Sequence, residues 1–292
     1  MPGGDCIALD ATMDALRRKG VECVETGWDS KAITDGQFDL CHIFHCNFSW
    51  SYGNYEAVKR SWKSGRLDGG NAPYVLTPIY YPGLLSGITD DQLEEIVFDA
   101  ALVLPFSNRE AMELREAVGY FPYEAIPNGT DPAFHCATPA SERKGVLCVS
   151  ARGTEDKGIP MVRAACEKLG IPFTAVTGVP HSELPAIYAK HRVFVNASDS
   201  ERMSLTTLEA LCSGCNVLSR WAGPGSKPAD RGWEWTMPKL VDVGNLSDLC
   251  LQIETAYRSE SHSWERSQER ARALTWDLVA DRLIDVYRWV IR

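Results

Sequence analysis

The sequence lacks the segments that would place the protein in a membrane or outside the cell. It has no apolar run approaching the roughly 20 residues that a helix needs to span a bilayer. Its first residues show no basic segment followed by an apolar one, which is the pattern of a secretory signal peptide. We therefore expect a cytoplasmic protein without a transmembrane helix, and peripheral contact with a membrane stays open.

The sequence is also short of positive charge. It has 30 Lys and Arg against 39 Asp and Glu, which gives a net charge of -9. Such an acidic chain disfavours indiscriminate binding to nucleic acid. The hydrophobic fraction of 45% and charged fraction of 24% are ordinary for a globular protein, which excludes disordered and fibrous classes. Because 292 residues exceed a usual single domain, we expect two.

The ten cysteines lack the setting of a disulfide framework. Several fall within apolar segments, where buried reduced thiols are typical: Cys23, Cys41, Cys148, Cys166 and Cys250. Cys212 and Cys215 have the spacing of a metal-binding pair, but no second such pair follows to complete a zinc site. We therefore expect the cysteines to pack in the core, and we assign no metal.

Short apolar runs alternate with helical patterns along the chain. The expected strands cover residues 21–26, 38–44, 73–78, 100–106, 145–151, 172–178, 192–198 and 216–220. The expected helices include residues 10–19, 90–100, 109–118, 160–169 and 205–212, and Gly20, Gly170 and Gly214 end three of them. Such alternation predicts an α/β protein with parallel sheets.

A stretch rich in Pro, Thr and Ser, residues 127–144, separates two runs of this pattern and is expected to link two domains. Residues 264–292 have the spacing of one or two amphipathic helices. We expect a first domain at residues 1–136, joined by a C-terminal helix at about 277–292, and a second domain at residues 137–276.

Charged side chains follow two of the expected strands of the second domain. Arg152 and the pair Lys157-Gly158 come between the strand at 145–151 and a helix, and Glu201 comes between the strand at 192–198 and the helix that holds Glu209. Taken singly, such charges are ordinary solvated side chains. Their joint order indicates an anion site, because ligands collect where strands end and helices begin in open parallel sheets.

This order resembles that of the retaining GT-B glycosyltransferases, the family that includes bacterial glycogen synthase and many mannosyl- and glucosyltransferases (glycosyltransferase group 1). The run VSARGTEDKG (149–158) is similar to the family's Arg-x4-Lys-Gly motif, and SDSERMSLTTLEALCSGCNVL (198–218) is similar to its Glu-x7-Glu segment. The run IPNGTD (126–131) resembles the Pro-Asn-Gly-x-Asp motif that closes the family's first domain. Gly3-Gly4 resembles its N-terminal glycine loop.

The resemblance implies two Rossmann-like domains facing a cleft. Because only Met1 and Pro2 precede the glycines, either the first domain is shortened by a strand or the natural start lies upstream. It further implies a retaining, metal-independent transferase that moves a hexose from a UDP- or GDP-sugar, such as UDP-glucose, to an acceptor hydroxyl. The nucleotide sugar is then a co-substrate, and no cofactor is implied.

Carried over position by position, the resemblance makes Arg152 and Lys157 the ligands of the donor's diphosphate. It makes Glu201 the ligand of the transferred sugar's hydroxyls and Glu209 the ligand of the ribose. It places Met203, Ser204 and Leu205 against phosphate or sugar.

Weaker matches add Gly4 and Val179 to the donor site. In the first domain, residues 38–45 (FDLCHIFH) are similar to a strand that ends in His-x-His in the family. This similarity implies that His45, or else His42, lines the sugar site.

Other interpretations stay open. Lys59, Arg60, Lys63 and Arg66 surround Trp62, a pattern typical of a solvated helix face but also of a surface for an anionic acceptor. Three classes of acceptor stay open: a carbohydrate, a lipid-linked group and a hydroxymethylated DNA base, as in viral DNA modification. The basic cluster is the cue for the DNA base. The alternatives in activity are another GT-B enzyme, such as an epimerase or a phosphorylase, and a binding module that holds nucleotide sugars without turnover.

Overall fold

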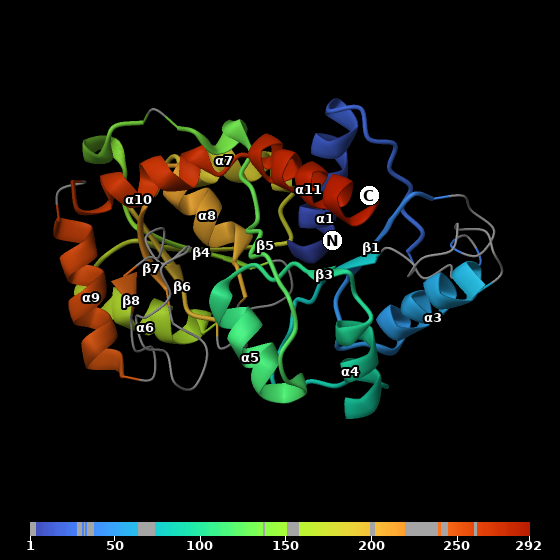
Figure 1. Ribbon diagram of the computed structural model, residues 1–292. Helices are drawn as coiled ribbons and strands as arrows, with labels where there is room; N and C mark the ends of the chain where they lie inside the picture. The colour runs from blue at the N-terminus through green and yellow to red at the C-terminus, as the bar shows by residue number, and fades with distance from the viewer. Residues whose placement is uncertain are drawn as a thin grey trace. The chain divides into compact units, whose positions relative to one another are not determined.

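The computed structural model describes residues 4–27, 31, 33, 38–63, 74–136, 138–150, 158–198, 202–219, 239–240, 245–259 and 262–292 (Figure 1). The chain divides into two compact units. One comprises Met13–Pro127 and Val279–Arg292, and we call it the three-stranded unit after its sheet. The other comprises Met1–Thr12 and Asn128–Leu278, and we call it the five-stranded unit.

The sheet of the three-stranded unit is parallel, in the order β1-β2-β3. Its strands are β1 (Cys41–Phe44), β2 (Tyr74–Thr77) and β3 (Leu102–Val103). All four residues of the central strand β2 are buried, as expected for a strand covered on both faces. The helices of this part of the chain are α3 (Ser49–Lys63), α4 (Asp90–Phe98) and α5 (Asn108–Val118).

Side-chain caps set where these helices begin. Thr89 accepts a hydrogen bond from the amide of Gln92, and the Gln92 side chain accepts one from the amide of Thr89, which completes a capping box before α4. Ser107 caps α5 by accepting from the amide of Glu110. The buried carboxylate of Glu110 in turn accepts from the amides of Tyr80 and Phe106 at 2.8 and 2.7 Å, so it ties together the segments after β2 and β3.

The sheet of the five-stranded unit is parallel, in the order β5-β4-β6-β7-β8. Its strands are β4 (Val146–Ser150), β5 (Phe173–Thr177), β6 (Val193–Asn196), β7 (Asn216–Ser219) and β8 (Lys239–Leu240). Helix α6 (Ile159–Leu169) packs against α9 (Leu246–Arg258), and α8 (Leu205–Cys212) packs against α10 (His262–Ala273). The two pairs lie on opposite faces of the sheet (Figure 1).

Two long helices include residues of both units. Helix α1 (Gly4–Arg18) begins in the residues assigned to the five-stranded unit, and α11 (Trp276–Val290) ends in those of the three-stranded unit. The short helix α7 (Leu184–Tyr188) and the 3-10 turns η1 (Pro132–Phe134), η2 (Ala140–Glu142) and η3 (His181–Glu183) complete the elements described. Among the described residues, no helix combines the length and the apolar composition required to cross a membrane.

One expected strand is absent. Residues 21–26 are described, and they form no strand. Val24 is 57% exposed, and Glu22 and Glu25 place charge on both sides of it, so the segment has no apolar face to bury. The expected helix at 10–19 is the second half of α1, which begins at Gly4.

The cysteines match in part the packing role that the sequence predicts. All ten are free thiols, and six of them are buried, including Cys148, Cys166 and Cys250, whereas Cys23 and Cys41 are only partly buried. Burial raises the pKa of Cys212 and of Cys215 to about 12 each, so both thiols stay protonated at neutral pH.

Candidate functional site

The strand order of the five-stranded sheet reverses between β4 and β6. From β4 the chain passes through α6 to β5 on one side, and from β6 it passes through α8 to β7 on the other. Because β4 and β6 are parallel neighbours, the segments that follow them leave the same edge of the sheet side by side. Ligands bind at such a switch point in open parallel sheets, since strand ends and helix N-termini converge there.

Three predicted site residues, Arg152, Lys157 and Glu201, lie outside the described residues. The ends of the segments that carry them are described. Gly158 precedes α6 with a φ of 63°, and a Cβ built on it would lie 2.7 Å from the carbonyl oxygen of Ala197, which follows β6. Gly158, which precedes α6, and Ala197, which follows β6, are therefore in backbone contact at the switch point.

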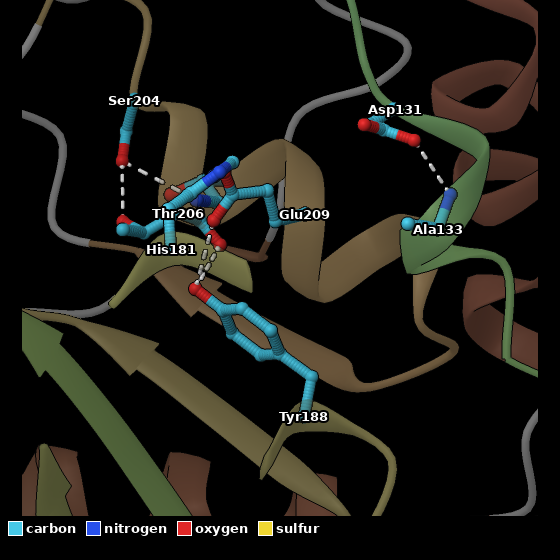
Figure 2. A network of polar contacts seen from close by, with 8 residues as sticks. Asp131, Ala133, His181, Tyr188, Ser204, Thr206 and Glu209 are labelled. Atoms are coloured by element: carbon cyan, nitrogen blue, oxygen red, sulfur yellow. Dashed lines mark hydrogen bonds and ion pairs between the residues drawn. The ribbon is translucent and has the colours of Figure 1, made fainter. Parts of the chain in front are cut away.

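The carboxylate of Glu209 lies buried on α8, and two side chains hold it (Figure 2). The Nε2 of His181 lies 2.6 Å from Oε1 of Glu209. The hydroxyl of Tyr188 lies 3.3 Å from Oε2 of Glu209 and from the carbonyl oxygen of Thr206, so its proton is shared between two acceptors. The hydrogen bond to Glu209 raises the pKa of His181 against the opposing effect of burial, and the charges of Glu209 and Asp131 add to the rise. Glu209 is thus a buried acid with a defined orientation.

Ser204 caps the helix that carries Glu209. Its hydroxyl accepts from the amide of Thr207 over 3.3 Å and lies 2.9 Å from the hydroxyl of Thr206 (Figure 2). The amides of Leu205 and Thr206, at the start of α8, form no hydrogen bond with any part of the chain that the structure describes. The N-terminus of α8 therefore offers amide donors and the positive end of its dipole to an anion.

Asn128 fixes the segment in front of α8. Its side-chain amide donates to the carbonyl oxygen of Met203 over 3.0 Å, and its backbone amide lies 3.2 Å from the sulfur of Met203. Beside it, Gly129 lies so close to Trp276 that an added Cβ would be 2.7 Å from the Trp276 backbone. The Pro-Asn-Gly-x-Asp run thus supports the segment that holds the predicted donor residues Met203, Ser204 and Leu205.

Val179 lies just beyond the carboxyl end of β5, between Gly178, which has a φ of 67°, and the 3-10 turn η3. Its side chain is partly buried against the core of the five-stranded unit. Val179 therefore lies two residues before His181, the partner of Glu209, on the same edge of the sheet. Gly4 is the first residue of α1, and its place in the donor site stays a prediction.

The structure gives the two candidate histidines of the three-stranded unit different surroundings. His42 uses both ring nitrogens: Nδ1 lies 2.7 Å from the hydroxyl of Tyr287 and Nε2 lies 2.9 Å from that of Thr77. Burial lowers the pKa of His42 to about 3, so its ring is neutral. His42 therefore joins β1, β2 and α11 as a structural residue.

His45 follows β1 in a left-handed conformation with a φ of 69°. Its backbone amide donates to the carbonyl oxygen of Thr77, and its ring meets those of Phe48 and Trp50 edge-on with centroids 5.3 and 5.4 Å away. Histidine is one of the non-glycine residues that adopt this conformation more often than most. Because His42 has a structural role, His45 is the candidate that remains for the sugar site, and its role there stays a prediction.

The described part of the basic cluster on α3 is paired with acids and a phenol. Lys59 lies 2.9 Å from the hydroxyl of Tyr55 and 3.7 Å from the carboxylate of Asp99, and Arg60 lies 3.5 Å from that of Glu56. These contacts are those of a solvated helix face, which weakens the cue for a nucleic-acid acceptor.

Sequence reasoning missed His181, Tyr188 and Asn128 as supporting residues of the site. His181 and Glu209 are 28 positions apart, and no spacing rule joins a 3-10 turn to a helix in the next βα repeat. For Asn128, the Pro-Asn-Gly run was visible in the sequence, but its contact with Met203 was not.

The chain is similar to solved structures over nearly its full length. Sucrose-phosphate synthase from Thermosynechococcus elongatus matches with a TM-score of 0.69 and 16% identity, over 99% of this chain and 94% of that one. HepE from Anabaena, solved with UDP and glucose, matches with a TM-score of 0.68 and 14% identity, over 98% of this chain and 96% of that one. Trehalose 6-phosphate synthase from Burkholderia multivorans matches with a TM-score of 0.64 and 14% identity, over 97% of this chain and 82% of that one.

No protein-family model and no curated protein matches the chain. The solved structures are GT-B glycosyltransferases, so the expected α/β fold of the GT-B type, with two parallel sheets, is confirmed. The resemblance that the motifs carry is confirmed at the level of this fold.

Proposed function

We propose that the protein is a retaining glycosyltransferase that binds a UDP- or GDP-sugar at the edge of the five-stranded sheet and transfers its hexose to an acceptor hydroxyl. The observation that carries the proposal is the buried, oriented carboxylate of Glu209 at the switch point. A carboxylate in that place suits the hydroxyl groups of a nucleotide ribose. Because HepE has also been solved with UDP-glucose, that sugar nucleotide is the first donor to test.

Positive groups at the same edge suit the donor's diphosphate. The N-terminus of α8 offers the amides of Leu205 and Thr206, and Gly158 brings the start of α6 against the end of β6. We place Arg152 and Lys157 here as the cations that compensate the charge growing on the diphosphate as the sugar leaves. Loss of one such partner of a developing anion costs about 10²–10³ in rate.

The remaining roles follow from the motif resemblance. Glu201 binds hydroxyl groups of the transferred hexose, and His45 lines the sugar site. In the transfer step the bond between the anomeric carbon and the diphosphate oxygen breaks, and the acceptor oxygen bonds to that carbon on the same face. The acceptor's proton passes to the departing diphosphate, so no protein nucleophile is required.

Donor hydrolysis in the absence of an acceptor tests the proposal, because water replaces the unknown acceptor. With UDP-glucose, we expect slow release of UDP and glucose, with α-glucose formed first in a proton NMR time course. We expect Lys157→Ala and Arg152→Ala to slow the release by about 10²–10³. Lys168→Ala is the matched control, because Lys168 is exposed in the last turn of α6, at the opposite end of the helix from Lys157.

Other products would identify other activities. Formation of β-glucose first would show an inverting enzyme, and release of UDP with an altered sugar would show an epimerase. Tight binding of the donor without any turnover would show a non-catalytic module.

A further inference from the structure

The carboxylate of Glu209 needs partners because it is buried. Glu209 is 4% exposed, and a buried charge is costly unless it is paired and hydrogen-bonded. Its partners come from the segment after β5: His181 from η3 and Tyr188 from the last turn of α7 (Figure 2). The contact with His181 is the shorter, at 2.6 Å against 3.3 Å for Tyr188. His181 is therefore the main side chain that fixes the orientation of Glu209.

The two contacts leave half of the carboxylate's acceptor capacity unused. An ionised carboxylate accepts about four hydrogen bonds, two at each oxygen. Within the described residues, His181 takes one position on Oε1. Tyr188 takes at most one on Oε2, because its single hydroxyl proton also has the carbonyl oxygen of Thr206 within 3.3 Å. One position per oxygen remains, which is the pattern that two neighbouring hydroxyl groups fill. The cis-diol of a ribose has that pattern, and a deoxyribose does not.

The imidazole of His181 is itself held in place. Its ring lies 5.2 Å from the ring of Phe134, which is 2% exposed. The charged groups that act on it are the carboxylates of Glu209 on α8 and of Asp131, which caps η1 by accepting from the amide of Ala133 (Figure 2). Both favour a positively charged ring, and charge-assisted hydrogen bonds are roughly twice as strong as neutral ones.

We infer that His181 is a positioning residue for the donor's ribose: it holds Oε1 of Glu209 so that the free acceptor positions of the carboxylate receive the ribose hydroxyls. The inference rests on the proposed function, because it takes the ligand to be a nucleotide. It assigns the selectivity for ribose over deoxyribose to the pair of His181 and Glu209 and not to Glu209 alone.

The test compares nucleotides that differ only in the ribose. Isothermal titration calorimetry measures the dissociation constants of UDP and GDP and of their 2′-deoxy counterparts for the wild-type protein, His181→Ala and His181→Gln. We expect His181→Ala to weaken the ribonucleotide about 10-fold and to leave the deoxynucleotide nearly unchanged, because the lost hydrogen bond acts through the ribose hydroxyls. His181→Gln keeps a side-chain donor and should restore most of the affinity.

His191→Gln is the matched control. His191 is another half-buried histidine of the same unit, and it contacts the carbonyl oxygen of Ile187 and the hydroxyl of Thr174 instead of Glu209. The His191→Gln substitution should leave the preference for the ribonucleotide over the deoxynucleotide unchanged. The inference is overturned, while the proposed function stands, if His181→Ala weakens the ribonucleotide and the deoxynucleotide equally. It is also overturned if His181→Ala and His181→Gln both keep the wild-type affinity. A wild-type protein that binds neither UDP nor GDP overturns both.

Discussion

Gly158 and Ala197 are in backbone contact: a Cβ built on Gly158 would lie 2.7 Å from the carbonyl oxygen of Ala197 and 2.8 Å from its Cβ. The contact joins the residue in front of α6 to the residue that follows β6. Glycine is required at position 158 for two reasons: a Cβ would clash with Ala197, and the backbone has a φ of 63°. The residue after Lys157 in the motif is therefore a glycine for a packing reason, and the packing holds the two halves of the switch point together.

Gly158→Ala should destabilise the protein and weaken donor binding together. The left-handed backbone costs ~1–2 kcal/mol for an alanine, and the overpacking against Ala197 adds ~1–3 kcal/mol. Urea unfolding and calorimetry with UDP measure the two effects. The control is Gly170→Ala at the other end of α6, where φ is 66° and no atom lies within 4 Å of an added Cβ. The Gly170→Ala variant should be destabilised only by the cost of the left-handed backbone, and it should keep its affinity for UDP.

The pH dependence of stability should carry a signature of His42. Its pKa in the folded protein is about 3, below the ordinary value of 6.5, so the unfolded chain binds the proton more readily. The free energy of unfolding should therefore fall as the pH drops below 6.5, by at most ~1.4 kcal/mol per pH unit for this group. Urea titrations of the wild-type protein and His42→Gln, which has no titrating ring, measure the difference. Parallel curves for the two proteins between pH 6.5 and pH 4 would contradict the neutral, buried ring.

His181 should give a signature of the opposite sign. Its pKa is raised in the folded protein, so its contribution to stability is fully present below pH 6.5 and is lost as the pH rises through the raised pKa. The free energy of unfolding of the wild-type protein should therefore decline above pH 6.5 relative to that of His181→Gln. The readout is the difference in this free energy between the two proteins, measured at pH 6 and at pH 9. A wild-type protein that gains stability over this range relative to the variant would refute the ion pair with Glu209.

Asn128→Ala should weaken donor binding although Asn128 is not itself a proposed ligand of the donor. The substitution removes the part-buried hydrogen bond to the carbonyl oxygen of Met203, which should cost ~0.5–1.5 kcal/mol of stability. We expect a weaker affinity for UDP as well, because the segment in front of α8 loses its support. Asn47→Ala is the control: Asn47 is fully buried in the three-stranded unit and donates to the carbonyl oxygens of Tyr81 and Leu84. It should lower stability without changing the affinity for UDP.

Removal of divalent metal should leave turnover unchanged. We propose that Arg152 and Lys157 compensate the charge of the departing diphosphate, so no metal ion is needed there. Initial rates of UDP release from UDP-glucose, with and without EDTA, check this expectation. A rate that EDTA abolishes and Mg²⁺ restores would show that the two cations do not suffice.

The sequence predicted the parts of the fold that depend on local pattern. The apolar runs around β2, β4, β6 and β7 are buried strands, and the helix expected at residues 205–212 has those bounds as α8. The segment at residues 21–26 has the apolar spacing of a strand and forms none, because its glutamates leave it no face to bury. Whether such a run pairs with a neighbour depends on contacts that periodicity does not contain.

The members of the candidate site that motif spacing predicts are Glu209 and the segment Met203–Leu205 in front of it, together with Arg152, Lys157 and Glu201, which lie outside the described residues. Their roles stay predictions. The contacts of Glu209 with His181 and Tyr188 join residues from successive βα repeats, so they depend on the strand order and not on the local sequence. The choice between His42 and His45 likewise required the position of Tyr287 on α11, far along the chain.

Whether Glu209 helps to bind a nucleotide-sugar donor is decided by a thermal-shift measurement with a panel of UDP- and GDP-sugars on the wild-type protein and Glu209→Gln. A bound donor stabilises the folded state by mass action, so at 100 times its Kd the stabilisation is about 2.7 kcal/mol. We expect at least one donor to raise the Tm of the wild-type protein and the rise to be largely lost in Glu209→Gln. A panel that leaves the wild-type Tm unchanged, or an equal rise in both proteins, would contradict this expectation.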